Sequence, residues 1–190
     1  MNEYISNYEN SDLSEKIKNK RILIINTKLK KDEILKKIEL LKKLFIDEFN
    51  KSDIDYELEP NLNHMMILLK GSILDNDYCK KINKTFSINE IENNLNKANT
   101  EEIDIGYLKE YIKLYKILDE INEMYLDLRS ILFNTISLVF DKDPEESNID
   151  DLIKEELTSL VENETLDETT YNILSEFMKF FLEEKAIMLM

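Results

Sequence analysis

The clearest pattern in the sequence is a run of apolar residues, three and four positions apart, that ends near Phe140. Such spacing places side chains on one face of an α-helix, so it predicts one long helix from shortly after Thr100 to about Phe140. From Ser130 onward the segment is apolar nearly all round, which is typical of a central core helix rather than a free coiled coil. The apolar positions are Tyr111, Leu114, Leu118, Ile121, Tyr125, Leu128, Leu132 and Val139.

Two shorter helices are expected after this segment. Pro144 stops the long helix, because proline lacks a backbone donor and restricts the residue before it. Residues 152 to 161 repeat the helical spacing, and the capping box Thr165 to Glu168 starts a last helix that runs through Leu182. The long central helix and the two C-terminal helices predict a mainly α fold with a bundle-like core.

The first half of the chain combines helical and strand-like patterns. Residues 31 to 51 have an apolar face and a lysine-rich face, which predicts an amphipathic helix. The capping box Ser87 to Glu90 predicts another helix, from about 88 to 98.

Three short segments favour strands instead. Arg21 to Asn26 is rich in isoleucine, Asp53 to Glu59 alternates, and Met65 to Leu69 is apolar and is followed by Gly71. Together they predict a small α/β N-terminal subregion.

Charge divides the chain near residue 100. Residues 1–100 carry 17 acidic and 17 basic side chains, whereas residues 101–190 carry 23 acidic and 8 basic ones. We therefore expect a disordered tail over 1–10, a basic to neutral subregion over 11–100 and an acidic helical subregion over 101–190, within one compact unit.

Composition restricts the location and chemistry of the protein. The N-terminus does not resemble a signal peptide, and the most apolar stretch, Ser130 to Phe140, is about half the ~20 residues that span a bilayer. A single cysteine agrees with a reducing compartment. These features predict a cytoplasmic protein, of a cell or an infected host, with no membrane association.

Common catalytic sites are not indicated. His64 is the only histidine and has no local motif around it, so we interpret it as a strand-edge residue. Two glycines cannot form the usual phosphate-binding loops, and one histidine with one cysteine cannot form a structural zinc site. We therefore predict a protein without catalytic residues, metal or cofactor.

Carboxylate-metal sites remain the least favoured alternative. Two acidic loops suggest calcium, one at Asp75, Asp77 and Cys79 and a stronger one after Phe140. The second loop fails the EF-hand pattern, so only weak, irregular binding of calcium or magnesium stays open. A metal-dependent nuclease would use Asp53, Glu57 and Glu59 near the predicted sheet. The residues of the second loop are Asp141, Asp143, Glu145 and Glu146.

A lysine-rich segment over residues 16–43 suggests contact with nucleic acid, because lysines neutralise phosphates. The same lysines are also typical of the solvated face of a helix, or of a surface that docks on an acidic region of this chain or of another copy. The candidate contacts are Lys28, Lys30, Lys31, Lys36, Lys37, Lys42 and Lys43.

Rows of carboxylates in the second half suggest the opposite partner, a basic protein. Acidic helices can present charge that resembles a nucleic-acid backbone, although acidic surfaces also simply keep proteins soluble. The leading interpretation is a non-enzymatic interaction protein that binds, and in one version inhibits, a basic partner, with homo-oligomers as a further option. The apolar segment Ala186 to Met190 also favours an interaction role. The candidate acidic contacts are Asp119, Glu120, Glu123, Asp127, Glu145, Glu146, Asp150, Asp151, Glu155 and Glu156.

Overall fold

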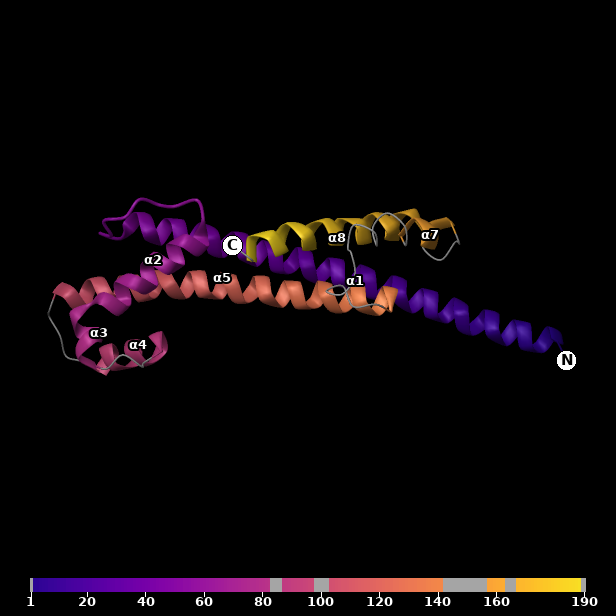
Figure 1. Cartoon of the computed structure of the whole chain (residues 1–190), viewed down its shortest axis with the longest axis horizontal. Helices are drawn as coiled ribbons and strands as arrows, with labels where there is room; N and C mark the ends of the chain where they lie inside the picture. The colour runs from indigo at the N-terminus through magenta and orange to yellow at the C-terminus, as the bar shows by residue number, and fades with distance from the viewer. Residues whose placement is uncertain (1, 83–86, 98–102, 142–156, 163–166, 189–190) are drawn as a thin grey trace. The chain divides into compact units, whose positions relative to one another are not determined.

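The structure is a computed structural model that describes residues 2–82, 87–97, 103–141, 157–162 and 167–188. Every regular element in these ranges is an α-helix (Figure 1). The helices are α1 (Asn2–Lys51), α2 (Leu62–Asp75), α3 (Asp77–Ile82), α4 (Ile88–Lys97), α5 (Ile103–Phe140), α7 (Leu157–Glu162) and α8 (Glu168–Met188). The mainly α fold class is therefore confirmed, as is the long helix that ends at Phe140.

The small α/β subregion is wrong, because the described residues of the first half contain no strand. Residues 21–26 lie inside α1, residues 65–69 lie inside α2, and residues 53–59 form no regular element. The isoleucine run misled because both faces of α1 are apolar there: Ile24 is fully buried, whereas Ile22 and Ile25 are about half exposed.

The chain forms two compact units, each with its own core. Unit 1 contains residues 1–35 and 125–190, and unit 2 contains residues 36–124. This division differs from the expected change near residue 100, because α1 and α5 each contribute to both units. Residues 2–10, for which we predicted a disordered tail, belong to the first turns of α1.

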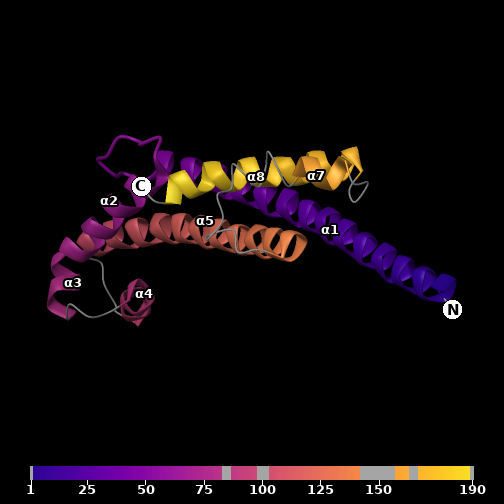
Figure 2. The ribbon, with the colours of Figure 1, turned by 45° about the vertical axis from the view of Figure 1, so that its right-hand side comes forward.

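Unit 1 is a helical core built from α1, α5 and α8, which run side by side in Figures 1 and 2. Ile24 of α1 packs with apolar residues of the last four turns of α5 and of the middle of α8. Contacts of Lys20 with Val139 and of Thr27 with Thr135 show that α1 and α5 are antiparallel. The core residues contributed by α5 and α8 are Leu128, Leu132, Ile136, Val139, Leu174, Phe177 and Met178.

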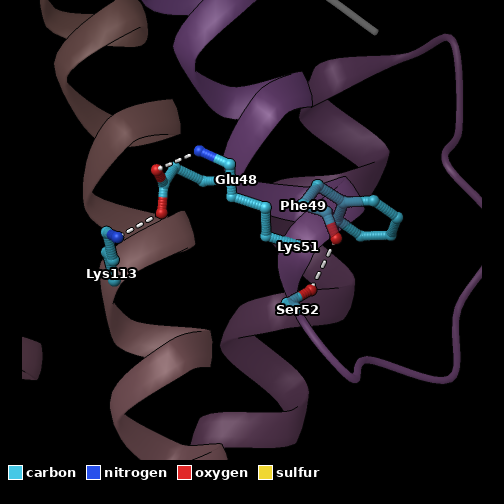
Figure 3. A network of polar contacts seen from close by, with 5 residues as sticks. All are labelled: Glu48, Phe49, Lys51, Ser52 and Lys113. Carbon is cyan, nitrogen blue, oxygen red and sulfur yellow. Dashed lines mark hydrogen bonds and ion pairs between the residues drawn. The ribbon is translucent and has the colours of Figure 1, made fainter.

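Unit 2 contains the end of α1, the helices α2, α3 and α4, and the beginning of α5. At the end of α1, the hydroxyl of Ser52 donates to the carbonyl of Phe49 at 2.7 Å, and the carboxylate of Glu48 binds both Lys51 and Lys113 (Figure 3). These contacts end α1 and tie it to α5.

The helix starts follow capping chemistry. The Ser87 amide donates to the Glu90 carboxylate at 2.9 Å and the Glu90 amide donates to the Ser87 hydroxyl at 3.3 Å, so the predicted capping box of α4 is confirmed. For α8 the cap is Asp167, whose carboxylate accepts from the Thr170 amide at 2.7 Å. Thr165, which we predicted as this cap, lies outside the described residues.

The end of α5 is marked by Asp141, which has a positive φ of 53°. Left-handed residues commonly follow the last turn of a helix and stop it. Pro144, to which we assigned this stop, lies outside the described residues. Within the described part of the chain, no helix combines the length and apolar character needed to cross a membrane.

Candidate functional site

The acidic surface that the structure describes is a stripe on α5. Glu120, Glu123 and Asp127 are exposed and are spaced three and four positions apart, so they follow one face of this helix. Among the described residues, no hydrogen bond or ion pair engages these three carboxylates. We call them the acidic stripe. Asp119 lies beside it but is only partly exposed, and its charge raises the pKa of the buried Tyr115 hydroxyl, after the larger effect of burial.

The other predicted acidic contacts come after α5 and before α7 in the sequence. Glu145, Glu146, Asp150, Asp151, Glu155 and Glu156 lie outside the described residues. The acidic stripe is therefore the part of this prediction on which structural arguments rest.

The lysine-rich segment does not form one surface, because α1 turns its lysines in different directions. Lys31 points into unit 1 and its side chain is only 3% exposed. Its ammonium lies 2.6 Å from Glu176 of α8 and 5.4 Å from the ring centres of Phe177 and Phe180. Contact of Lys31 with a phosphate would require this lysine to leave Glu176 and the core of unit 1, so Lys31 is the least accessible of the predicted nucleic-acid contacts.

Lys28 shares the same carboxylate. Its ammonium lies 3.0 Å from the second oxygen of Glu176. Hydrogen bonds from Lys31 and Lys28 lower the pKa of Glu176, and the hydrogen bond to Glu176 raises the pKa of Lys28. One glutamate of α8 thus neutralises two of the seven candidate lysines.

Lys20, earlier on the same face of α1, caps the end of α5. It donates to the carbonyl of Val139 at 2.7 Å and lies 3.6 Å from the carboxylate of Asp141. The last carbonyls of a helix lack partners within the helix and attract cations. This lysine therefore stabilises the core of unit 1.

The remaining candidate lysines lie on the outer faces of α1. Lys30, Lys36 and Lys43 are exposed, whereas Lys42 binds Glu39 at 3.1 Å and Lys37 also takes part in an interaction. Lys37 is exposed as well, so among the described residues Lys30, Lys36 and Lys43 are the candidate lysines that could bind a phosphate without losing a known contact.

The carboxylate-metal alternatives find no support in the geometry. No group of three metal-ligating side chains gathers anywhere in the described parts of the chain, which include Asp53, Glu57 and Glu59. Asn76 caps α3 through the Tyr78 amide at 2.9 Å, so the predicted loop around Cys79 is a helix. Cys79 is buried, and burial raises the pKa of its thiol.

His64 was also misplaced by the strand prediction. It lies in the first turn of α2, where its amide donates to the capping side chain of Asn61 at 3.2 Å. Its half-exposed ring has Nδ1 3.6 Å from the carboxylate of Glu59. The contacts of His64 with Asn61 are those of a residue at a helix start.

Comparison of the chain with protein-family models, with curated proteins and with solved structures finds no match.

Sequence reasoning missed the pairing of Glu176 with Lys28 and Lys31. Glu176 and the apolar pattern of α8 are visible in the sequence, but the partner helix is not. Ile24, Thr27 and Lys31 have the three- and four-residue spacing of a buried helix face, and this was the available signal.

Proposed function

We propose that this chain is a non-enzymatic interaction protein that binds a basic protein partner through the acidic stripe of α5. The observation that carries the proposal is the contrast between two sets of charges. Glu120, Glu123 and Asp127 project from α5 with no ion pair among the described residues, while Lys28 and Lys31 are neutralised inside unit 1.

One exposed apolar residue lies beside the acidic stripe. Leu126, with 48% of its surface exposed, lies between Glu123 and Asp127 in the sequence and offers an apolar contact beside the charges. Charges around an interface accelerate association and select the partner, so we expect the three carboxylates to contribute mainly to the rate and specificity of binding. A basic partner that normally binds nucleic acid would be inhibited by occupation of its phosphate-binding surface, in the cytoplasm of a cell or an infected host.

The test is affinity capture with the full chain from a nuclease-treated lysate at about 0.1 M salt, where screening is only partial. Nuclease treatment removes capture through bridging nucleic acid. The variant Glu120→Gln, Glu123→Gln, Asp127→Asn removes the acidic stripe.

A matched control removes the same number of charges elsewhere, through Asp47→Asn, Asp53→Asn and Glu57→Gln, at three exposed residues. We expect basic proteins that bind the wild type and the control but not the stripe variant. Each captured protein is then tested for loss of binding to a labelled DNA duplex as this chain is added. If both variants retain the same proteins, the stripe is not the binding surface.

The second candidate is a nucleic-acid-associated subunit, supported by the exposed positions of Lys30, Lys36 and Lys43 on α1. Fluorescence anisotropy with single- and double-stranded DNA and RNA at about 50 and 200 mM salt tests it, because phosphate-driven binding weakens steeply with salt. Replacement of these three lysines by glutamine should abolish binding. Replacement of the exposed Lys70, Lys97 and Lys109 is the control and should change it little.

A further inference from the structure

The outer face of α1 in unit 1 is apolar although the opposite face already forms the core. Ile22, Ile25 and Leu29 are 47%, 46% and 63% exposed. At about 100° per residue the three side chains fall within an arc of about 60°. Among the described residues, none covers this arc, whereas Ile24 and Thr27 on the other side are buried.

Single exposed aliphatic residues are ordinary on protein surfaces, but three on one helix face form a continuous apolar strip. Residues of opposite charge border this strip along the helix axis. Lys18 precedes it by one turn, Glu33 follows it by one turn, and both are exposed on the same face.

The arrangement is self-complementary about the midpoint between Ile25 and Asn26. Lys18 and Glu33 are equally far from this point, and so are Ile22 and Leu29. A two-fold axis at the midpoint, perpendicular to α1, would place Lys18 opposite Glu33 of the partner subunit and Ile22 opposite Leu29 of the partner subunit.

We propose that the chain self-associates through this face, with two copies of α1 antiparallel about a two-fold axis near Ile25 and Asn26. Such an interface uses the same patch on both copies, so each contact occurs twice and the assembly closes as a dimer. A parallel arrangement would place lysine against lysine and glutamate against glutamate, so the charges select the antiparallel one. Glu33 already takes part in an interaction within its own chain, and its two oxygens accept from more than one donor.

The first test is sedimentation velocity of the full chain across about 5 to 500 µM, where a small interface is expected to dissociate. We expect a monomer–dimer equilibrium. Lys18→Glu and Glu33→Lys should each raise the dimer Kd by about tenfold, since each reverses two contacts, and the double variant should restore it to within about threefold.

Two variants in unit 2 serve as controls for the change in net charge. Lys70→Glu and Asp47→Lys change the charge of the chain by the same amounts as the single reversals, at exposed residues far along the sequence. They should leave the dimer Kd unchanged. The proposed interface would be wrong if the unit 2 variants raised the dimer Kd as much as the α1 variants did. It would also be wrong if the Kd did not recover in the double variant Lys18→Glu, Glu33→Lys.

The second test locates the axis by oxidation of introduced cysteines. Asn19 and Asn26 are seven residues apart, both exposed and on the same face of α1. Asn26→Cys should form a disulfide-linked dimer, because it lies beside the axis, whereas Asn19→Cys should not. Cys79 is buried and serves as the unreacted background in both variants.

Equal crosslinking at the two positions would indicate parallel helices and overturn the proposal. A chain that stays monomeric at every concentration would overturn it as well. If that monomer instead sediments with phosphatidylserine vesicles, the apolar face of α1 binds an anionic lipid surface and not a second copy.

Discussion

The ammonium of Lys31 lies 2.6 Å from a carboxylate oxygen of Glu176, although 145 positions separate the two residues in the sequence. Only the lysine is buried, with 3% of its side chain exposed against 51% for the glutamate. A buried ammonium loses its hydration and depends on a partner that can remain partly solvated. This pair, together with the two phenylalanines of α8 around the lysine, fixes how α8 meets α1.

Removal of the carboxylate should destabilise unit 1. Glu176→Gln leaves the charge of Lys31 without a counterion, and we expect a loss of about 1–3 kcal/mol, limited because Glu176 is half exposed. Adding Lys31→Met should bring stability back to within about 1 kcal/mol of wild type, since a buried pair can often be replaced by apolar groups. Urea unfolding followed by circular dichroism measures both. No recovery in the double variant would mean that the pair contributes more than charge compensation.

The same pair predicts how stability changes with pH. Hydrogen bonds from Lys31 and Lys28 lower the pKa of Glu176 from its ordinary value of 4.5. The stabilisation is therefore present above about pH 4.5 and is lost as pH falls through the lower pKa of the folded state. Lys28 behaves oppositely: its raised pKa gives stabilisation below pH 10.5 that is lost as pH rises through the folded pKa.

Melting temperatures of the wild type and Glu176→Gln, measured between about pH 3 and 7, test this effect. The difference between the two proteins should shrink toward the acidic end. A difference that stays constant would mean that the Glu176 carboxylate titrates alike in the folded and unfolded chains.

Two buried threonines should respond unequally to substitution. The Thr135 hydroxyl donates to the carbonyl of Ile131 at 2.9 Å, so its single proton is used and Thr27, 2.8 Å away, must donate to Thr135. Thr135→Val leaves the Thr27 proton without an acceptor and should cost about 1–3 kcal/mol, whereas Thr27→Val should cost about 1 kcal/mol.

The double replacement by valine should cost less than the two single effects added together, because no buried hydroxyl remains. Chemical denaturation of the four proteins gives this coupling directly. Equal costs for the two single variants would contradict the assigned direction of the hydrogen bond.

The cap of α8 gives a local prediction. Hydrogen bonds from the side chain and the amide of Thr170 lower the pKa of the Asp167 carboxylate. Asp167→Ala should therefore lower stability by about 1 kcal/mol, and Asp167→Asn, which keeps an acceptor, by much less. Amide hydrogen exchange should show faster opening at the start of α8, with α4 unchanged. Ser87→Ala, in the capping box of α4, should produce the reverse pattern.

Helices with one apolar face could be predicted from the sequence, because their burial pattern repeats at helical spacing. Segment 31–51 and the helix that ends at Phe140 were predicted in this way, whereas segment 88–98 was predicted from its capping box. The run around Ile24 failed because the strip Ile22, Ile25 and Leu29 is apolar on the outer face, which hides the period of the buried face.

The segment from Met65 to Leu69 failed for a different reason. Met65, Leu69 and Ile73 are buried at intervals of four, but Gly71 made the apolar run look like a strand that stops. The Asn61 cap after Pro60 was the overlooked sign of a helix start. In the candidate site, helical spacing alone places Glu120, Glu123 and Asp127 on one face of α5. The pairing of Lys28 and Lys31 with Glu176 could not be predicted, because Glu176 lies on a helix far away in the sequence.

Unit 1 consists of residues 1–35 and 125–190, and in the sequence all of unit 2 comes between these two segments. During translation, residues 36–124 are complete and able to fold while α8 has not yet been made. Until then the core around Ile24 lacks the apolar residues of α8, and part of the inner face of α1 remains accessible together with its apolar outer face. We therefore expect unit 1 to fold last, with ribosome-bound chains that lack α8 as the species most prone to aggregate and most in need of chaperones.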